Sequence, residues 1–438
     1  MSKVLVLGLS KSGIAAAKFL KKHGYDVYLT ENKKVEPDPE LQKLGIKTET
    51  GGHSLNFVEG AEFAVTSPGI PPFSTIIELL RLKNIPVISE LELAYRMSDT
   101  PFIAITGTNG KTTTTALTAH IFEKKFKSKA CGNIGQPPCD FADDKLDYYV
   151  CEMSSYQIAM SPTLTPFISV WTNFTPDHID WHQGIENYFA AKAKIFKAPQ
   201  APEFSVLNAC DNRLKDFEAG GKVFYFGERK GGSCCYVKNN EFIYEKDGVV
   251  EFVMPVGDCP LVGEHNFQNV ECAIICAKLA GIDNETIKAA IKEFKSPAHR
   301  LEFVGEKDGI AFYNDSKATN PEAADVAIKS FNDKDVVLIA GGRDKNTSLK
   351  EFCDEVKKHV KTVILIGEAA ERFEKNLQNS GFNNILREET MQSAIDKAID
   401  LKPDVVLLSP ACASFDMLKS YEERGDVFKD YVLSKIGK

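Results

Sequence analysis

The heptapeptide Thr106-Gly107-Thr108-Asn109-Gly110-Lys111-Thr112 indicates an α/β fold, because a strand pattern precedes it and a helix pattern follows it. The apolar run 102–105 is typical of a buried strand, and residues 113–124 have helical character. Strand, Gly-rich turn and helix in this order are the setting of a phosphate-binding loop. Glycines let backbone N–H groups point at phosphate oxygens, and the beginning of the helix adds a positive dipole. Lys111 would then lie near the β- and γ-phosphates, and Thr112 would offer a hydroxyl to Mg²⁺.

The spacing of the two glycines departs from the commonest form of this loop. That form would place a glycine at Ile105, whereas Gly107 and Gly110 are closer together and predict a tighter turn. A turn that only caps a helix is the alternative. The Gly-Lys-Thr sequence at the junction of strand and helix favours phosphate binding.

Three further segments offer polar groups. The apolar run 148–152 ends in Glu152, where a phosphate-loop protein usually has its metal-binding carboxylate; a partner for a core cation or a helix cap is the alternative. The loop 175–180 contains His178, either a metal or phosphate contact or a structural histidine. A predicted helix over 188–196 carries Lys192, and its neighbouring lysines make a solvated basic face the simplest interpretation from composition.

The pattern of strands alternating with helices extends outward from the loop in both directions. With 438 residues the chain has room for roughly three domains, and the alternation indicates parallel sheets. We predict a Rossmann-like domain at 1–95, a central P-loop ATPase-like domain at 96–296 and a Rossmann-like domain at 297–438. The central domain includes a small antiparallel element between Cys234 and Val253.

Composition excludes several classes of protein. Hydrophobic residues make up 43% and charged residues 26%, which is ordinary for a globular protein, and the net charge of −8 disfavours a broad nucleic-acid-binding surface. No apolar run approaches the ~18 residues of a membrane span, and the N-terminus lacks the pattern of a signal peptide. The 11 scattered cysteines include no CxxC pair. We therefore expect a cytoplasmic protein with reduced thiols and no structural zinc.

These segments together resemble the Mur ligases, the ATP-dependent amide-bond ligases of bacterial peptidoglycan synthesis. Within that family, Ser67–Ile70, Asn314–Asn320 and Leu408–Asp416 are most similar to the D-glutamate-adding members. The matching segments along the chain are TGTNGKTTTT (106–115), GNIG (132–135), EMSSYQ (152–157), TPDHIDWH (175–182), AAKAKIF (190–196), GEHNFQN (263–269), HRLEF (299–303) and NDSKATNP (314–321).

The resemblance implies an acid–D-amino-acid ligase that joins D-glutamate to UDP-N-acetylmuramoyl-L-alanine through an acyl phosphate, forming ADP and phosphate. The implied ATP-binding residues are Gly107, Thr108, Asn109, Gly110, Lys111, Thr112, Thr113, Asn266, Asn269, Arg300 and Asp315. The implied ligands of two Mg²⁺ ions are Thr112, Glu152, His178 and Lys192, with Lys192 carrying CO₂ as a carbamate. The implied catalytic residues are Lys111, Asn133, His178, Lys192, Arg300 and Lys317.

The resemblance also assigns the first and third domains. The first would bind the UDP-sugar, although Ser10 stands where the dinucleotide pattern GxGxxG has glycine, and Glu31 stands where an aspartate is commoner in the family. Its contacts would be Lys11, Ser12, Glu31, Asn32, Ser67 and Gly69. The third would bind D-glutamate through Thr319, Lys345, Ser414 and Phe415. A monomer is expected.

Three alternatives remain open at this stage. Another Mur ligase or a folylpolyglutamate-type ligase would share the architecture but use a different acceptor amino acid. A P-loop ATPase or switch would hydrolyse ATP without an amino acid. A nicotinamide dehydrogenase would use the first domain, and Ser10 argues against it.

Overall fold

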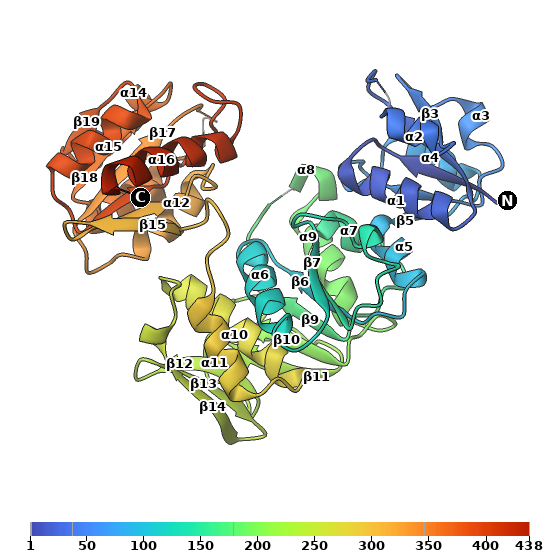
Figure 1. Cartoon of the computed structure of the whole chain (residues 1–438), viewed down its shortest axis with the longest axis horizontal. Helices are drawn as coiled ribbons and strands as arrows, with labels where there is room; N and C mark the ends of the chain where they lie inside the picture. The colour runs from blue at the N-terminus through green and yellow to red at the C-terminus, as the bar shows by residue number, and fades with distance from the viewer. Residues whose placement is uncertain (1, 37, 178, 345–346, 438) are drawn as a thin grey trace. The chain divides into compact units, whose positions relative to one another are not determined.

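The computed structural model describes residues 2–36, 38–177, 179–344 and 347–437 (Figure 1). It contains three separate β-sheets of five, nine and six strands. The chain divides into two compact units, Met1–Asp258 with Gln268–Lys292, and Cys259–Phe267 with Glu293–Lys438. Across the described ranges, no helix combines the length and the apolar character that crossing a bilayer requires.

The first sheet is parallel and has the order β3-β2-β1-β4-β5. Alternate residues of β1 enter different cores: Val4 and Val6 pack in one cluster with Leu20 of α1, while Leu5 and Leu7 pack in another with Leu80 of α4. Helices therefore cover both faces of this sheet, as predicted for a Rossmann-like domain. The elements are β1 Lys3–Leu7, α1 Lys11–Lys22, β2 Asp26–Glu31, α2 Pro39–Lys43, β3 Lys47–Thr50, α3 Leu55–Val58, β4 Phe63–Thr66, α4 Thr75–Leu82, β5 Val87–Ser89 and α5 Glu90–Arg96.

The second sheet has the order β14-β13-β12-β11-β10-β9-β6-β8-β7. Its strands are parallel except for the two hairpin pairings β12–β13 and β13–β14, which confirm the predicted antiparallel element. The strands are β6 Phe102–Thr106, β7 Ser128–Gly132, β8 Tyr148–Glu152, β9 Ile168–Trp171, β10 Phe204–Asn208, β11 Lys222–Phe226, β12 Cys234–Lys238, β13 Glu241–Lys246 and β14 Val249–Pro255. The helices are α6 Lys111–Phe122, η1 Pro138–Asp140, α7 Ser155–Ala159, α8 Ile179–His182, α9 Ile185–Ala193, η2 Lys194–Phe196, η3 Val256–Asp258, α10 Glu264–Leu279 and α11 Asn284–Glu293.

The third sheet has the order β15-β16-β20-β17-β18-β19. Four of its pairings are parallel, and only the edge strand β15 runs antiparallel to its neighbour. We did not predict β15 as a strand, because its sequence Glu-Phe-Val-Gly-Glu-Lys is half polar and contains a glycine. The elements are β15 Glu302–Lys307, β16 Ile310–Asn314, α12 Pro321–Lys329, β17 Val336–Gly341, α13 Lys350–His359, β18 Thr362–Ile366, α14 Ala370–Asn379, β19 Ile385–Arg387, α15 Met391–Asp400, β20 Val405–Leu408 and α16 Tyr421–Ile436.

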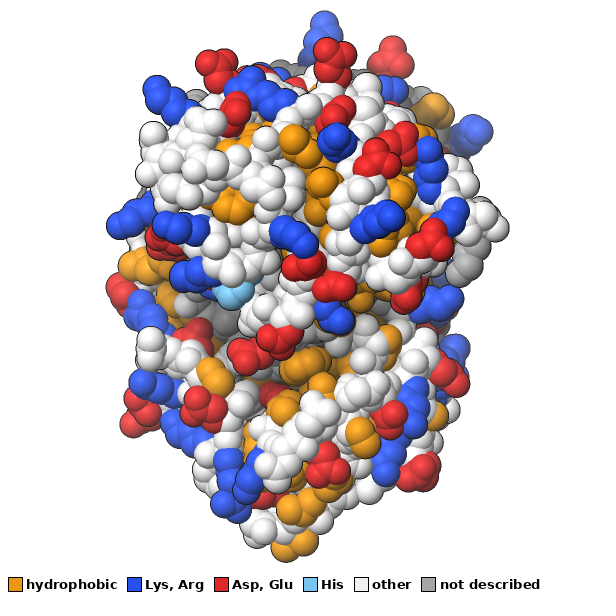
Figure 2. All heavy atoms as spheres, turned by 90° about the vertical axis from the view of Figure 1, so that its left-hand side faces the viewer, with side chains coloured by type: hydrophobic (Ala, Val, Ile, Leu, Met, Phe, Trp, Pro, Cys, Tyr) orange, Lys and Arg blue, Asp and Glu red, His pale blue; other side chains and the backbone are white. Residues whose placement is uncertain are grey.

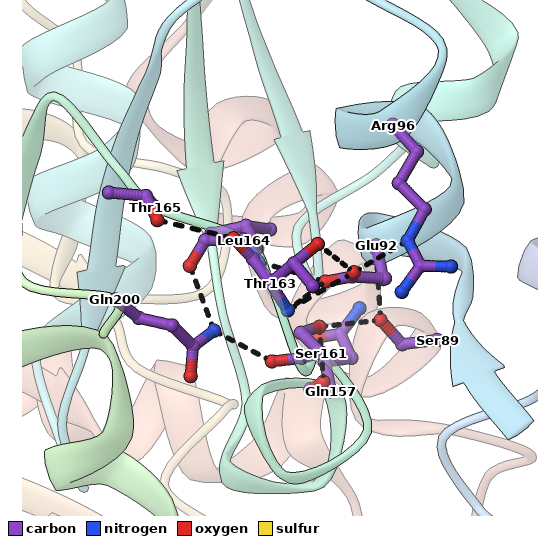
Figure 3. A network of polar contacts seen from close by, with 9 residues as sticks. All are labelled: Ser89, Glu92, Arg96, Gln157, Ser161, Thr163, Leu164, Thr165 and Gln200. Atoms are coloured by element: carbon purple, nitrogen blue, oxygen red, sulfur yellow. Dashed lines mark hydrogen bonds and ion pairs between the residues drawn. The ribbon is translucent and has the colours of Figure 1, made fainter. Parts of the chain in front are cut away.

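Helix α5 is joined to the turn at 160–165 by a buried carboxylate (Figure 3). The side chain of Glu92 accepts hydrogen bonds from the backbone N–H of Thr163 and of Leu164, at 3.1 and 2.9 Å. It also accepts from the Thr163 hydroxyl and, at 2.8 Å, from the guanidinium of Arg96. A fully buried carboxylate needs several donors to offset its lost hydration. This network links the end of the first sheet to the second sheet's loops.

Charges of both signs alternate over the surface drawn in Figure 2. Lys and Arg side chains are interspersed there with Asp and Glu, and hydrophobic side chains lie between them. An alternating surface produces no strong field of one sign. The described part of this face therefore lacks the broad basic patch of a nucleic-acid-binding protein, in line with the net charge of −8.

Candidate active site

The Gly-rich loop between β6 and α6 requires both of its glycines. Gly107 has φ +148° and Gly110 has φ +81°. A Cβ at Gly107 would lie 1.9 Å from the hydroxyl oxygen of Thr172, and one at Gly110 would lie 2.5 Å from Oδ1 of Asn269. The loop therefore has the tight form expected from its spacing, and neither glycine position has room for a side chain.

The segment after β9 fixes the loop from one side. The Thr172 hydroxyl donates to the carbonyl of Asn109 at 2.6 Å. The backbone N–H of Thr108 donates to the Asn173 carbonyl at 3.0 Å, and that of Asn109 to Asn173 Oδ1 at 2.8 Å. We did not predict Thr172 and Asn173 as site residues. The available signal was their position directly after a strand that, in a parallel sheet, ends at the same edge as β6.

The beginning of α6 presents uncapped N–H groups beside a lysine. No side chain caps the helix at Gly110, and its first turn contains no acidic residue. Lys111 Nζ donates to the carbonyls of Gly107 and Thr108, at 3.1 and 2.8 Å. Thr112 and Thr113 follow in the same first turn. Uncapped N–H groups and a cation are the donors that a polyphosphate needs.

A buried carboxylate ends the neighbouring strand β8. Glu152 is 2% exposed and lies in register with Ile105 of β6. Its Oε1 accepts from the side-chain amide of Asn133 at 2.7 Å, while its Oε2 has no hydrogen-bond partner among the described residues. A buried carboxylate oxygen without a donor fits a divalent cation, which prefers oxygen ligands.

The structure describes some of the predicted metal ligands and not others. His178 lies outside the described residues, so its role stays a prediction. Within the described ranges, no group of three or more His, Cys, Asp and Glu side chains could hold a metal ion. Mg²⁺ usually takes only one or two protein carboxylates and completes its shell with water and phosphate. The buried carboxylate of Glu152 is a ligand of that kind, and the role of the Thr112 hydroxyl stays a prediction.

Lys192 does not belong to a solvated basic face. It lies in α9 and is only 1% exposed, and its Nζ donates to the carbonyl of Gly107 at 2.7 Å. Burial, and next the charge of Lys111, lower the pKa of Lys192 well below its ordinary value. The interpretation from composition is therefore wrong for this residue, although Lys197 in the same segment is exposed.

The two asparagines of α10 are both buried. Asn269 accepts a hydrogen bond from the Thr114 hydroxyl of α6 at 3.0 Å, so it lies against the phosphate-loop helix. Asn266 donates to the carbonyl of Val262 at 2.8 Å. Their predicted contacts with the adenosine part of ATP remain predictions.

The predicted residues of the third sheet gather at the carboxyl ends of β16 and β20. Asp315 follows β16 and accepts from the hydroxyl of Ser409, which follows β20, at 2.8 Å. Burial raises the pKa of Asp315 to about 7. Lys317 Nζ lies 3.9 Å from the centre of the Tyr421 ring. Arg300 is partly buried.

The predicted D-glutamate residues have different surroundings. Ser414 is buried, whereas the next side chain, Phe415, is 64% exposed. Thr319 is partly buried on the loop between β16 and α12. Lys345 lies outside the described residues. The structure thus places three of the four residues near carboxyl ends of the third sheet's strands, and their role stays a prediction.

The first sheet has a cavity at its topological switch point. A space of about 460 Å³ is lined by Glu31, Asn32 and Gly69 among others. It lies where β1 separates β2 from β4, the usual ligand position in an open parallel sheet. The other three predicted residues, Lys11, Ser12 and Ser67, do not line it. Ser67 is buried and hydrogen-bonds Ser10, with 2.7 Å between their hydroxyl oxygens.

Glu31 is already engaged by the backbone. Its two carboxylate oxygens accept from the N–H groups of Leu9 and Lys33, at 3.0 and 2.8 Å. Burial raises the pKa of Glu31, but hydrogen bonds from Lys33 and Leu9 together with nearby positive charge outweigh it, so the net pKa is lowered. An ionised acceptor at the end of β2 suits a sugar hydroxyl.

Comparison with protein families matches all three parts of the chain. Residues 2–89 match the N-terminal domain of MurD-like Mur ligases, 105–277 the Mur ligase middle domain, and 299–412 the Mur ligase glutamate ligase domain. The chain belongs to the Mur ligase family.

Several relatives of this Mur ligase match over their full length. A UDP-N-acetylmuramoylalanine–D-glutamate ligase from Pelotomaculum thermopropionicum is 39% identical, over 99% of this chain and 97% of its own. One from Trichormus variabilis is 41% identical over 100% of both chains. The UDP-N-acetylmuramate-alanine ligase structure from Thermotoga maritima has a TM-score of 0.60 at 19% identity, covering 99% of this chain and 100% of its own, which bears on the fold alone.

Proposed function

We propose that this Mur ligase joins D-glutamate to UDP-N-acetylmuramoyl-L-alanine at the expense of ATP. The observation that carries the proposal is the arrangement around the Gly107 carbonyl, which accepts from both Lys111 and Lys192, at 3.1 and 2.7 Å. One lysine belongs to a phosphate-binding helix and the other is a buried amine. The full-length relatives named for D-glutamate ligation supply the substrates.

The chemistry follows from the low reactivity of a carboxylate toward an amine. The L-alanyl carboxylate attacks the γ-phosphorus of ATP, which forms an acyl phosphate and releases ADP. The neutral amine of D-glutamate then attacks the acyl carbon, phosphate leaves, and the nitrogen loses a proton. The first turn of α6, Lys111 and Arg300 would neutralise charge on the phosphoryl oxygens.

A divalent cation fits this site. Glu152 and Thr112, with His178 at a second position, would bind Mg²⁺, which supplies positive charge to the phosphates. Asn133 would orient Glu152 through their 2.7 Å hydrogen bond. Asp315, Asn266, Asn269 and Lys317 are the further nucleotide-side and reaction-side residues of the proposal.

The state of Lys192 supports the proposed carbamate. Only a neutral amine attacks CO₂. The nitrogen then loses a proton, and the product is a carbamate anion. The lowered pKa of Lys192 favours that neutral form. The modification would convert Lys192 into a longer anion, which would attract the Lys111 cation beside it.

The outer domains would bind the two other substrates. The cavity lined by Glu31, Asn32 and Gly69 would accept the uridine end of UDP-N-acetylmuramoyl-L-alanine. D-Glutamate has two carboxylates, so its site needs cations and hydroxyl donors. Thr319, Lys345 and Ser414, beside Phe415, are the residues proposed for it.

The test is phosphate release from ATP with UDP-N-acetylmuramoyl-L-alanine, with and without D-glutamate. We expect phosphate release to require both UDP-N-acetylmuramoyl-L-alanine and D-glutamate. Replacement of D-glutamate by L-glutamate or meso-diaminopimelate should give much less phosphate. Equal release without any amino acid would indicate an ATPase. Preference for another acceptor would indicate a different ligase.

A further inference from the structure

The first residue of helix α5, Glu90, is a buried acid that none of the site assignments uses. It is 2% exposed and follows the last residue of β5. Its Oε1 accepts from the backbone N–H of Cys139 in η1 at 2.7 Å. The Cys139 thiol donates back to the Glu90 carbonyl at 3.6 Å. The acid therefore joins the end of the first sheet to a loop of the second.

That loop begins with Asn133. At its start, the backbone N–H of Asn133 donates to the Glu152 carbonyl at 2.9 Å, and its side chain donates to Glu152 Oε1. Near its end stand Pro137 and Pro138, which have no N–H. Cys139 is thus the first residue after Gln136 that can anchor the far end through a backbone donor. Glu152 thus holds the start of the loop and Glu90 holds the segment just after it, while the Gly132 N–H donates to the Gln136 carbonyl at 2.9 Å across the loop.

The hydrogen bond between Glu90 and Cys139 is buried, so its loss would not be compensated by water. Among the described residues, Glu90 Oε2 is buried without a partner, and the hydrogen bonds of this side chain are made with Cys139 alone. Burial raises the pKa of Glu90 to about 7, and the ionisable groups that act on it are Cys139 and Asp140. Removal of the acceptor would leave the Cys139 N–H buried and unpaired.

We propose that Glu90 is a positioning residue of the ligation reaction: through Cys139 it fixes the 133–138 loop, and so orients Asn133 against Glu152. The inference rests on the proposed function, because Asn133 and Glu152 act on the transferred phosphoryl group only in that reaction. Glu90 itself touches no reacting atom.

The experiment compares full-length Glu90→Leu, which removes the acceptor, with Glu90→Gln, which keeps an oxygen acceptor. Glu92→Leu is the matched control, because it removes the other buried carboxylate of α5, whose partners Thr163 and Leu164 lie on a different turn. Initial rates are measured well below the unfolding temperature of every variant. Hydrogen exchange is followed in the peptide 132–141 without ligands.

We expect Glu90→Leu to lower kcat at least tenfold, with the KM for ATP unchanged within threefold. Exchange in 132–141 should rise at the same time. Glu90→Gln should restore kcat to within threefold of the wild type. Glu92→Leu should lower the unfolding temperature without changing kcat more than threefold or exchange in 132–141.

An unchanged kcat or unchanged exchange in Glu90→Leu overturns the inference, and so does an equal loss of kcat in Glu92→Leu. If Glu90→Leu does not fold, Glu90→Asp, which is shorter by one methylene, enters the same comparison under the same criteria. Failure of the proposed function is seen separately, as wild-type protein that shows no D-glutamate-dependent phosphate release. The exchange result still decides whether Glu90 fixes the loop.

Discussion

Burial, and next the charge of Lys111, lower the pKa of Lys192 well below that of an exposed lysine. Among the described residues, its hydrogen-bond partners are the Gly107 carbonyl and the Thr106 hydroxyl, and neither is acidic. Burial of an amine costs stability, and a buried lysine with a strongly lowered pKa commonly marks a site that uses its reactivity. The proposed carbamate is such a use.

Lys192→Ala should therefore lower kcat by on the order of 10²-fold or more, because the proposed anion beside Lys111 is lost. A small carboxylic acid such as formate should restore part of the rate by occupying the space that the carbamate leaves. The exposed Lys197→Ala is the control and should retain wild-type turnover. Steady-state phosphate release measures all three. Full activity of Lys192→Ala would exclude the carbamate.

Glu271 offers a pH test of a single buried acid. It lies in α10 and accepts from the N–H of Gly227 at 2.7 Å. Burial raises its pKa to about 8 in the folded protein, against an ordinary value of 4.5. The folded state thus binds the proton more tightly than the unfolded state. This contribution to stability is complete below about pH 4.5 and is lost as the pH rises toward 8.

Glu271→Gln cannot ionise, so its unfolding temperature relative to the wild type should rise as the pH increases from 5 to 8. At pH 4 the difference should be smallest. Thermal unfolding across that range measures it. A difference that does not vary with pH would mean that Glu271 stays ionised in the folded protein.

At the scale of elements, α5 carries two buried acids that join it to different loops. Glu92→Leu removes the acceptor of two backbone N–H groups and of the Thr163 hydroxyl (Figure 3). The Leu164 N–H left buried and unpaired, together with the lost hydrogen bonds to Thr163, should lower the free energy of unfolding by about 3 kcal/mol. Thr165→Ala, on the same turn but with its hydroxyl in an exposed hydrogen bond, should change it by less than about 0.5 kcal/mol.

Chemical denaturation of both variants measures that difference. Equal stabilities of Glu92→Leu and the wild type would show that water replaces the carboxylate without loss. The hydrogen bonds of Glu92 would then contribute nothing to the packing of α5.

For the whole molecule, the expected state in solution is a monomer. The exposed large hydrophobic side chains of the described residues are distributed over all three sheets and their helices, as Leu82 of α4, Val249 of β14 and Phe303 of β15 illustrate. A stable dimer usually needs one contiguous apolar patch. Light scattering should therefore give 48.4 kDa at micromolar concentration. A mass twice as large would contradict this expectation.

Much of the fold and part of the site could be predicted because the relevant signals are local. The phosphate loop is read from consecutive residues whose backbone geometry depends on Gly107 and Gly110. The antiparallel hairpins follow from short alternating runs. The antiparallel β15 could not be predicted in this way, since its pairing with β16 depends on a partner strand and not on its own sequence.

Site residues with a local sequence signal could also be predicted, whereas those that depend on distant partners could not. Glu152 was found because it directly ends an apolar strand. Thr172 and Asn173 were missed, because their importance arises from hydrogen bonds to the loop of a strand more than 60 positions away in the chain. Glu90 was missed for the same reason, since its partner Cys139 is 49 positions distant.

The sequence by itself determined the alternation of strands and helices outside β15, the glycine-dependent turn and the family, because these depend on neighbouring residues and on ordered motifs. Only the tertiary structure decided that Lys192 is a buried, weakly basic amine and not part of a solvated face. It also decided which carboxylate oxygens remain without a donor. Burial and hydrogen-bond pairing are set by segments distant in the chain, and they control pKa and the capacity to bind a ligand.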